Sequence, residues 1–168
     1  MKTYFLLFLT IILFSCNKSV TTEDAKEFKI KIFELNKFNV KASQLFVDEA
    51  NKVEKQLKVN PEYVVDFEKL IKLNSNAIEK NEYAISQLAN MTEIDKEINY
   101  KNSHQEYLIS MRDLLNIFKE RFESLQKSRD TKTNELCKRR VFLKLKSMKQ
   151  KQKQLKETES EFNKKYKL

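Results

Sequence analysis

The 168-residue chain contains no glycine at all, and this absence limits its possible folds more than any other feature. Glycine adopts positive φ freely and lets the backbone approach a ligand closely. The glycine-rich phosphate loops of nucleotide-binding proteins and the nucleophile elbow of hydrolases require it, so these motifs are excluded. Tight Asn-Gly hairpins are excluded as well, which counts against a mostly β fold. With 34% charged and 40% hydrophobic residues, the composition is typical of long amphipathic helices.

Apolar side chains recur every three or four residues in four stretches, which is the periodicity of amphipathic helices. The first helix is expected to begin near Thr22, with acidic residues in its first turn, and to stop before Asn60 and Pro61. Its core-facing residues are predicted to be Phe28, Ile32, Leu35, Phe38, Ala42, Leu45, Phe46, Val53 and Leu57.

The Asn60–Pro61 pair indicates the start of the second helix. Asparagine is a favoured N-cap residue, and proline is favoured in the first helical position. Val59 and Val64 are placed to pack against each other across this cap as a hydrophobic staple. The second helix is then expected to end about Asn90. Its inward residues are predicted to be Val64, Phe67, Leu70, Ile71, Ile78, Ile85 and Leu88.

Two more helices are expected after Asn90. Thr92 and Asp95 have the spacing of a helix cap, so the third helix should follow them directly and include Ile98. Poor helix formers gather in residues 128–134, which predicts a break there and a fourth helix over residues 135–168. The apolar seam of this last helix is thin: Val141, Leu145, Met148, Leu155, Phe162 and Tyr166.

Short links between helices of similar length make neighbouring helices antiparallel. The sequence therefore predicts an all-α fold, an elongated antiparallel three- to four-helix bundle with coiled-coil character. Residues 22–127 are expected to form the bundle and residues 128–168 a basic C-terminal helix.

The N-terminal residues have the features of an export signal. Lys2 precedes an apolar run of about ten residues, which is too short to cross a bilayer of roughly 30 Å. The run ends in Leu13-Phe14-Ser15-Cys16, which resembles the lipobox of bacterial lipoproteins. This resemblance implies that residues 1–15 are a signal peptide that is removed, that Cys16 is lipidated, and that residues 16–21 are a tether.

In outline the chain is similar to small helical lipoproteins of unknown function from Bacteroidota and spirochaetes. The resemblance implies a lipid anchor in the bacterial cell envelope. Because Asn17 is not an acidic retention signal, the outer membrane is favoured over the inner. A signal peptide that is cleaved elsewhere, with Cys16 incidental, is the alternative.

Four polar residues fall where the helical period predicts core. Asn39, Asn81 and His104 lie in the middle of the apolar stripes of the first, second and third helices, and Asn74 does so on the second. Antiparallel folding brings the first three to the same height in the bundle. We consider two interpretations, a hydrogen-bonded layer that fixes the helix register and a small pocket for a ligand or ion.

The sequence shows no catalytic pattern. His104 is the only histidine, and Lys101 stands where a Glu-x-x-His metal motif needs a glutamate. Without glycine, no oxyanion nest or loop-borne nucleophile is indicated. We therefore expect no enzyme activity, no metal and no cofactor. Once Cys16 is lipidated, Cys137 is the remaining thiol, either a small residue of a helix or the link of a disulfide-bonded homodimer.

The net charge of +9 lies entirely at the C-terminal end. Residues 1–137 contain 21 basic and 21 acidic residues, whereas residues 138–168 contain 12 basic and 3 acidic ones. Such a segment favours anionic partners, unless it is only a solvated helix without a specific role. The predicted contact residues are Lys138, Arg139, Arg140, Lys144, Lys146, Lys149, Lys151, Lys153 and Lys156.

The resemblance to a lipobox implies a location outside the cytoplasm, where anionic lipid and cell-wall polymers are the polyanions that the chain would meet. The lysine-rich stretch also lacks aromatic residues, so no nucleic-acid partner is expected. The sequence thus predicts a membrane-anchored, non-catalytic envelope lipoprotein that acts as a binding or spacer module through its basic helix. The alternative is a membrane-tethered inhibitor or immunity-type protein that binds one protein partner through the bundle.

Overall fold

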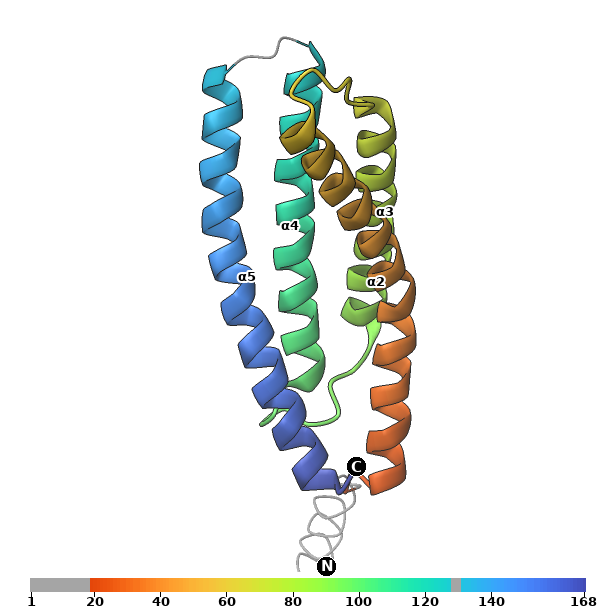
Figure 1. Ribbon diagram of the computed structural model, residues 1–168. Helices are drawn as coiled ribbons and strands as arrows, with labels where there is room; N and C mark the ends of the chain where they lie inside the picture. Colours follow the sequence, from red (N-terminus) through yellow and green to blue (C-terminus); the bar gives the residue numbers. More distant parts are fainter. Residues whose placement is uncertain (1–18, 128–130) are drawn as a thin grey trace, which may run out of the picture.

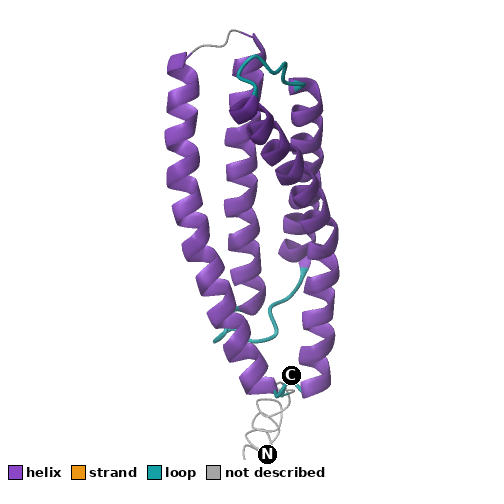
Figure 2. Cartoon of the chain, in the orientation of Figure 1, coloured by secondary structure: helices purple, strands orange, loops and turns teal. Residues whose placement is uncertain are grey.

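The computed structural model describes residues 19–127 and 131–168, and in these ranges the chain is helical with no strand (Figures 1 and 2). Successive helices run in opposite directions, which confirms the predicted all-α antiparallel bundle. The longest, α2, has 38 residues, or about 57 Å at 1.5 Å per residue. The helices of the described ranges are α2 (Thr22–Val59), α3 (Phe67–Asn90), α4 (Tyr100–Lys127) and α5 (Thr131–Tyr166).

Helices that follow each other in the chain are also neighbours in space. α4 packs against both α3 and α5, and α3 also packs against α2. α5 is thus the fourth helix of the bundle and lies alongside α4 over much of its length (Figure 1). It begins at Thr131, earlier than the expected residue 135, and the linking residues 128–130 lie outside the described ranges.

Two apolar clusters fill the interior, one toward each end. The first lies where α2 begins and α5 ends, and it contains residues of all four helices, among them Phe28, Leu88, Leu108 and Phe162. The second surrounds Phe46 and is built from α2, α3 and α4, with no described residue of α5. α5 therefore enters these clusters only near its C-terminal end.

The start of α2 is as predicted from the sequence. The hydroxyl oxygen of Thr21 accepts a hydrogen bond from the backbone N–H of Asp24 at 3.1 Å. The carboxylate of Asp24 in turn accepts one from the backbone N–H of Thr21 at 3.0 Å. This reciprocal capping box satisfies two donors that a helix end leaves free.

The start of α3 differs from the prediction. The helix begins at Phe67, and its N-cap is Asp66, which accepts a hydrogen bond from the backbone N–H of Lys69 at 2.9 Å. Asn60 instead accepts from the backbone N–H of Glu62 within a turn. The predicted staple is wrong, because Val59 and Val64 are both largely exposed. The segment after Pro61 crosses the end of the bundle and packs other side chains on the second cluster, namely Tyr63 and Val65.

The start of α4 also differs. Residues 91–99 form a loop across the opposite end, and the helix begins only at Tyr100. Asp95 does not cap the expected helix. Its buried carboxylate accepts hydrogen bonds from the backbone N–H groups of Glu97 and Ile98. It also accepts one from the hydroxyl of Tyr166 at 2.9 Å and lies 2.7 Å from the Lys165 ammonium. Asp95 therefore fastens the loop to the last turn of α5.

The predicted apolar stripe of α2 is too broad. Phe38, Leu45 and Leu57 are exposed by 64%, 50% and 38%, and Leu145 of α5 is exposed as well. Phe38 lies on the flank of α2 beside Tyr83 of α3, where no further helix of the described ranges covers it. Contact with one neighbouring helix buries a narrower stripe of α2 than its apolar periodicity predicts.

Candidate functional site

The nine predicted basic residues occupy three different sides of α5. Three of them pair with carboxylates of α4 that stand seven residues apart, so these cations face α4. The pairs are Arg140 with Glu120, Lys144 with Asp113 (2.7 Å) and Lys151 with Glu106 (2.5 Å). Burial alone would raise the pKa of Asp113, but the hydrogen bonds from Lys144 and Arg112 outweigh it and hold the pKa below its ordinary value. This third of the predicted surface serves to fix α5 against α4.

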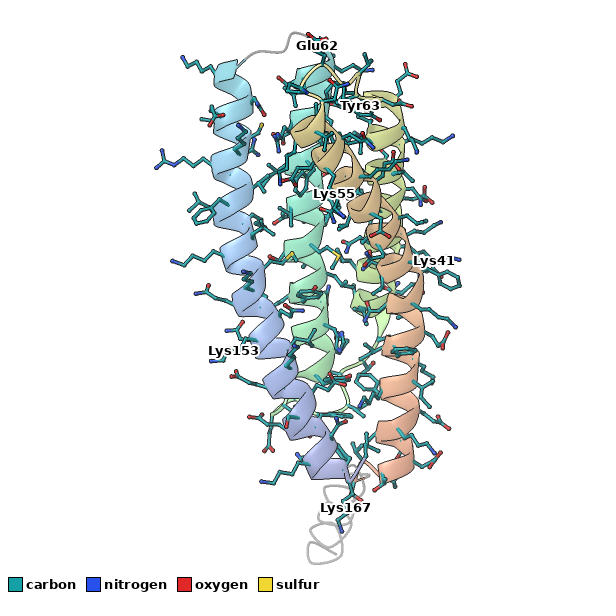
Figure 3. The ribbon with its side chains drawn as sticks, viewed as in Figure 1. Lys41, Lys55, Glu62, Tyr63, Lys153 and Lys167 are labelled. Carbon is teal, nitrogen blue, oxygen red and sulfur yellow. The ribbon has the colours of Figure 1, made fainter. Side chains whose placement is uncertain are left out.

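A second set, here called the basic stripe, faces away from the bundle. It comprises Arg139, Lys146 and Lys153, which are exposed and stand seven residues apart. Lys153 lies 3.6 Å from Glu157 on the same helix, an exposed pair of small energetic value. Arg139 and Lys146 form no ion pair with any described residue. Figure 3 shows Lys153 on the side of α5 that points away from the other helices.

The third set, here called the groove-side lysines, comprises Lys138, Lys149 and Lys156. Lys138 lines a cavity of about 530 Å³ whose other lining residues belong to α2, to α4, to the start of α3 and to the segment before it. Lys149 and Lys156 follow it by 11 and 18 residues, so at 100° per residue they lie within about 20° of its direction. All three are exposed.

The polar residues expected in the core are placed as follows. Asn39, Asn74 and Asn81 are fully buried, and His104 is partly buried. Nδ1 of His104 lies 3.2 Å from the amide nitrogen of Asn36. The amide nitrogen of Asn39 donates to the sulfur of Met111 at 3.7 Å. Neither amide atom of Asn81 has a hydrogen-bond partner among the described residues. These contacts do not join the three predicted residues into one hydrogen-bonded layer.

His104 and Asn39 line the same cavity, of about 490 Å³, between α2, α4 and α5, and Asn81 does not. Burial lowers the pKa of His104 to about 4; Glu159 opposes this shift and Lys29 adds to it. The ring is therefore neutral at physiological pH. Within the described ranges no cluster of histidine, cysteine and acidic side chains has the makings of a metal site.

The two predicted cysteine sites differ in what the structure says of them. Cys137 is a free, buried thiol, 2% exposed, so a second chain reaches it only if α5 opens locally. Cys16 and the rest of the lipobox lie outside the described residues. In the part of the chain that is described, no helix combines the length and apolarity needed to cross a bilayer.

Two cavities that the sequence did not predict lie over α4, between α2 and α5. Phe33, Val40 and Val47 of α2 line them, seven residues apart and off the predicted core stripe. That spacing was the available signal, because three apolar residues at seven-residue intervals mark a second face of a helix. Comparison with protein-family models, curated proteins and solved structures finds no match to this chain.

Proposed function

We propose that the chain is a non-catalytic envelope lipoprotein, anchored through Cys16, that binds an anionic envelope polymer through the basic stripe. The observation that supports this function is the division of the basic residues of α5. Arg140, Lys144 and Lys151 are neutralised by α4, whereas the basic stripe remains exposed and aligned along one side of the helix. Aligned cations attract a polyanion more strongly than scattered ones.

The position of the stripe favours a cell-wall polymer over the headgroups of the anchoring membrane. α2 begins and α5 ends at the same end of the bundle (Figure 1). Residues 17–21 allow a tether of at most about 22 Å between Cys16 and the first residue of α2. Along α5 the stripe lies about 20–40 Å from Tyr166, at 1.5 Å per residue. With the bundle upright, this separation exceeds the Debye length of about 8 Å at physiological salt.

The test of this function compares two triple charge reversals with the same net charge. Arg139→Glu/Lys146→Glu/Lys153→Glu removes the stripe. Lys41→Glu/Lys52→Glu/Lys55→Glu changes exposed lysines of α2, two of which are labelled in Figure 3. Each lysine near a charged surface contributes about 1 kcal/mol, so the stripe variant is expected to bind isolated anionic cell walls at least about 30-fold more weakly. The control is expected to change less than about threefold.

The readout is co-sedimentation of residues 17–168 with isolated cell walls and, separately, with vesicles containing phosphatidylglycerol. Equal losses in both triple variants would show that net charge, not the stripe, determines binding. Tight binding to vesicles without binding to walls would contradict the polymer as partner.

The anchor is tested by replacing one sulfur. Cys16→Ser in the full chain is expected to abolish incorporation of labelled palmitate and to release the mature domain from the membrane fraction, because serine accepts no thioether-linked diacylglycerol. Cys137→Ser is the matched control and is expected to keep both properties. Palmitate incorporation that survives in Cys16→Ser would contradict the proposed anchor.

A second candidate function, an inhibitor or immunity-type protein that binds one protein partner, is supported by a different surface. The cavities between α2 and α5 expose apolar side chains in a row. Such a row on a bundle is a typical docking site for another helix.

A further inference from the structure

The groove between α2 and α5 is a place where the four-helix bundle is not closed. At one end the two helices meet: the rings of Phe28 and Phe162 lie 6.3 Å apart, and Lys29 lies 3.2 Å from Glu159. Beyond Lys29, no ion pair, hydrogen bond or ring contact joins described residues of α2 to those of α5. α5 is bonded there to α4 alone, and the second apolar cluster contains none of its residues.

This groove consists of the two cavities of about 490 and 530 Å³, one above the other along α4. One wall is the apolar ledge, defined as Phe33, Val40 and Val47, whose side chains are 66%, 58% and 44% exposed. The floor is apolar too and belongs to α4, with Met111 in the first cavity and Phe118 in the second. The ledge repeats every seven residues, or about 10.5 Å, which is the repeat that a packed neighbouring helix presents.

The opposite wall of the groove belongs to α5, which lines the two cavities with Lys138, Leu155 and Glu159. Helical spacing places Lys149 and Lys156 on the same side of α5 as Lys138. Neither forms an ion pair with a described residue, whereas Lys138 pairs with Glu135 at 2.5 Å. Together the two cavities are lined by the cations Lys29, Lys37, Arg121 and Lys138 against the carboxylates Glu54 and Glu159. The groove thus has one apolar wall, an apolar floor and an excess of positive charge in its lining.

We propose that this groove binds an amphipathic helix of a partner protein, with the apolar stripe of that helix on the ledge and an acidic edge toward the groove-side lysines. The proposal gives the second candidate function its class of partner and does not depend on the basic stripe. A second copy of this chain is disfavoured as occupant, because its exposed helix α5 is itself basic and would be repelled. A single anionic lipid would fill one cavity and would not use a ledge that runs through both.

The test uses a fluorescent 21-residue peptide with leucine at the two apolar heptad positions and glutamate along one flank, and a twin with lysine in place of each glutamate. Fluorescence anisotropy is expected to show at least about tenfold tighter binding of the acidic peptide to residues 17–168. Phe33→Ser/Val40→Ser is expected to weaken this binding at least about tenfold. The matched control Phe38→Ser/Leu45→Ser changes two exposed residues at the same spacing on the other flank of α2, and it is expected to bind as the parent does.

Charge is tested separately on α5. Lys149→Glu/Lys156→Glu is expected to reduce binding of the acidic peptide, whereas Lys146→Glu/Lys153→Glu on the basic stripe is expected to leave it within about twofold. Circular dichroism checks that all variants keep the helix content of the parent. Failure of the polymer-binding function leaves the peptide result unchanged, so the two proposals are judged independently.

The proposal would be overturned if the ledge variant Phe33→Ser/Val40→Ser and its control bind the peptide equally. It would also be overturned if the parent binds no peptide and the ledge variant loses uptake of a fluorescent fatty acid, or if the parent dimerises in sedimentation and the ledge variant does not. A native protein that is captured equally by the ledge and control variants would overturn the groove but leave the inhibitor function standing.

Discussion

Phe162→Ala is expected to lower the free energy of unfolding by about 3–5 kcal/mol, the range typical of a buried phenylalanine cut back to its Cβ. The Phe162 side chain is 0% exposed. Its ring stacks on Tyr100 at a centroid distance of 4.6 Å, and it lies 4.8 Å from Tyr166 and 6.3 Å from Phe28. Because these rings belong to three helices, the cavity left by the mutation opens where α2, α4 and α5 meet, and the structure around it cannot collapse easily.

Urea unfolding followed by far-ultraviolet circular dichroism measures this loss. Phe142→Ala is the matched control, because Phe142 is on the same helix but is 70% exposed, and a change within about 0.5 kcal/mol is expected. Losses of equal size in the two variants would mean that α5 does not dock through its C-terminal turns. The result bears on function as well, because both proposed surfaces include α5 in the docked position.

The helical period identified the deepest part of this core from the sequence. Phe28, Ile32, Phe46 and Phe162 were predicted to face inward and do so, because a helix that must bury a face does so at spacings of three and four. The width of that face could not be predicted in the same way. Whether Phe38 is covered depends on how many helices surround α2 and at what angles, and local sequence does not contain this information.

Helix starts were harder to predict for a related reason. Thr92 and Asp95 have the spacing of a cap, but Asp95 forms long-range bonds with Lys165 and Tyr166 in place of a local one. A hydrogen bond between residues 71 positions apart cannot be predicted from the four-residue spacing of a helix cap. Asp66 caps α3 in place of the predicted Asn60. A start at this later residue leaves the preceding segment free to cover the end of the bundle.

The division of the basic residues among three sides of α5 could be predicted in part from the sequence. Glu106, Asp113 and Glu120 stand seven residues apart on the third predicted helix, and an antiparallel neighbour offers them cations at matching heights. The apolar ledge could have been found from its seven-residue spacing, but the groove itself could not, because it depends on α2 and α5 separating beyond their contact at Lys29. Both candidate surfaces thus follow from tertiary geometry acting on patterns that the sequence contains.

Acid is expected to destabilise the bundle through His104 as the pH falls below neutrality. The His104 ring packs edge-on against Tyr100 at 4.8 Å, and its Nδ1 faces the amide nitrogen of Asn36, an arrangement that requires a neutral ring nitrogen as acceptor. Burial lowers the pKa to about 4 from 6.5. As the pH falls below 6.5, the unfolded chain therefore binds a proton at this residue and the folded chain does not.

The contribution of His104 to the free energy of unfolding should thus be nearly constant above pH 7 and should fall by about 2 kcal/mol between pH 7 and pH 5, at 1.36 kcal/mol per unit of pKa difference. Asp95 and Asp113 do not contribute in this window, because their pKa values are held below the ordinary range and their stabilisation is lost only at lower pH.

Urea unfolding at pH 7 and pH 5, on the parent and on His104→Gln, measures the effect. Because the chain has a single histidine, the free energy of unfolding of the variant should differ little between pH 7 and pH 5. A parent and a variant that lose the same stability would show that His104 carries a proton inside the bundle, and the cavity that it lines with Asn39 would then hold a positive charge at mildly acidic pH.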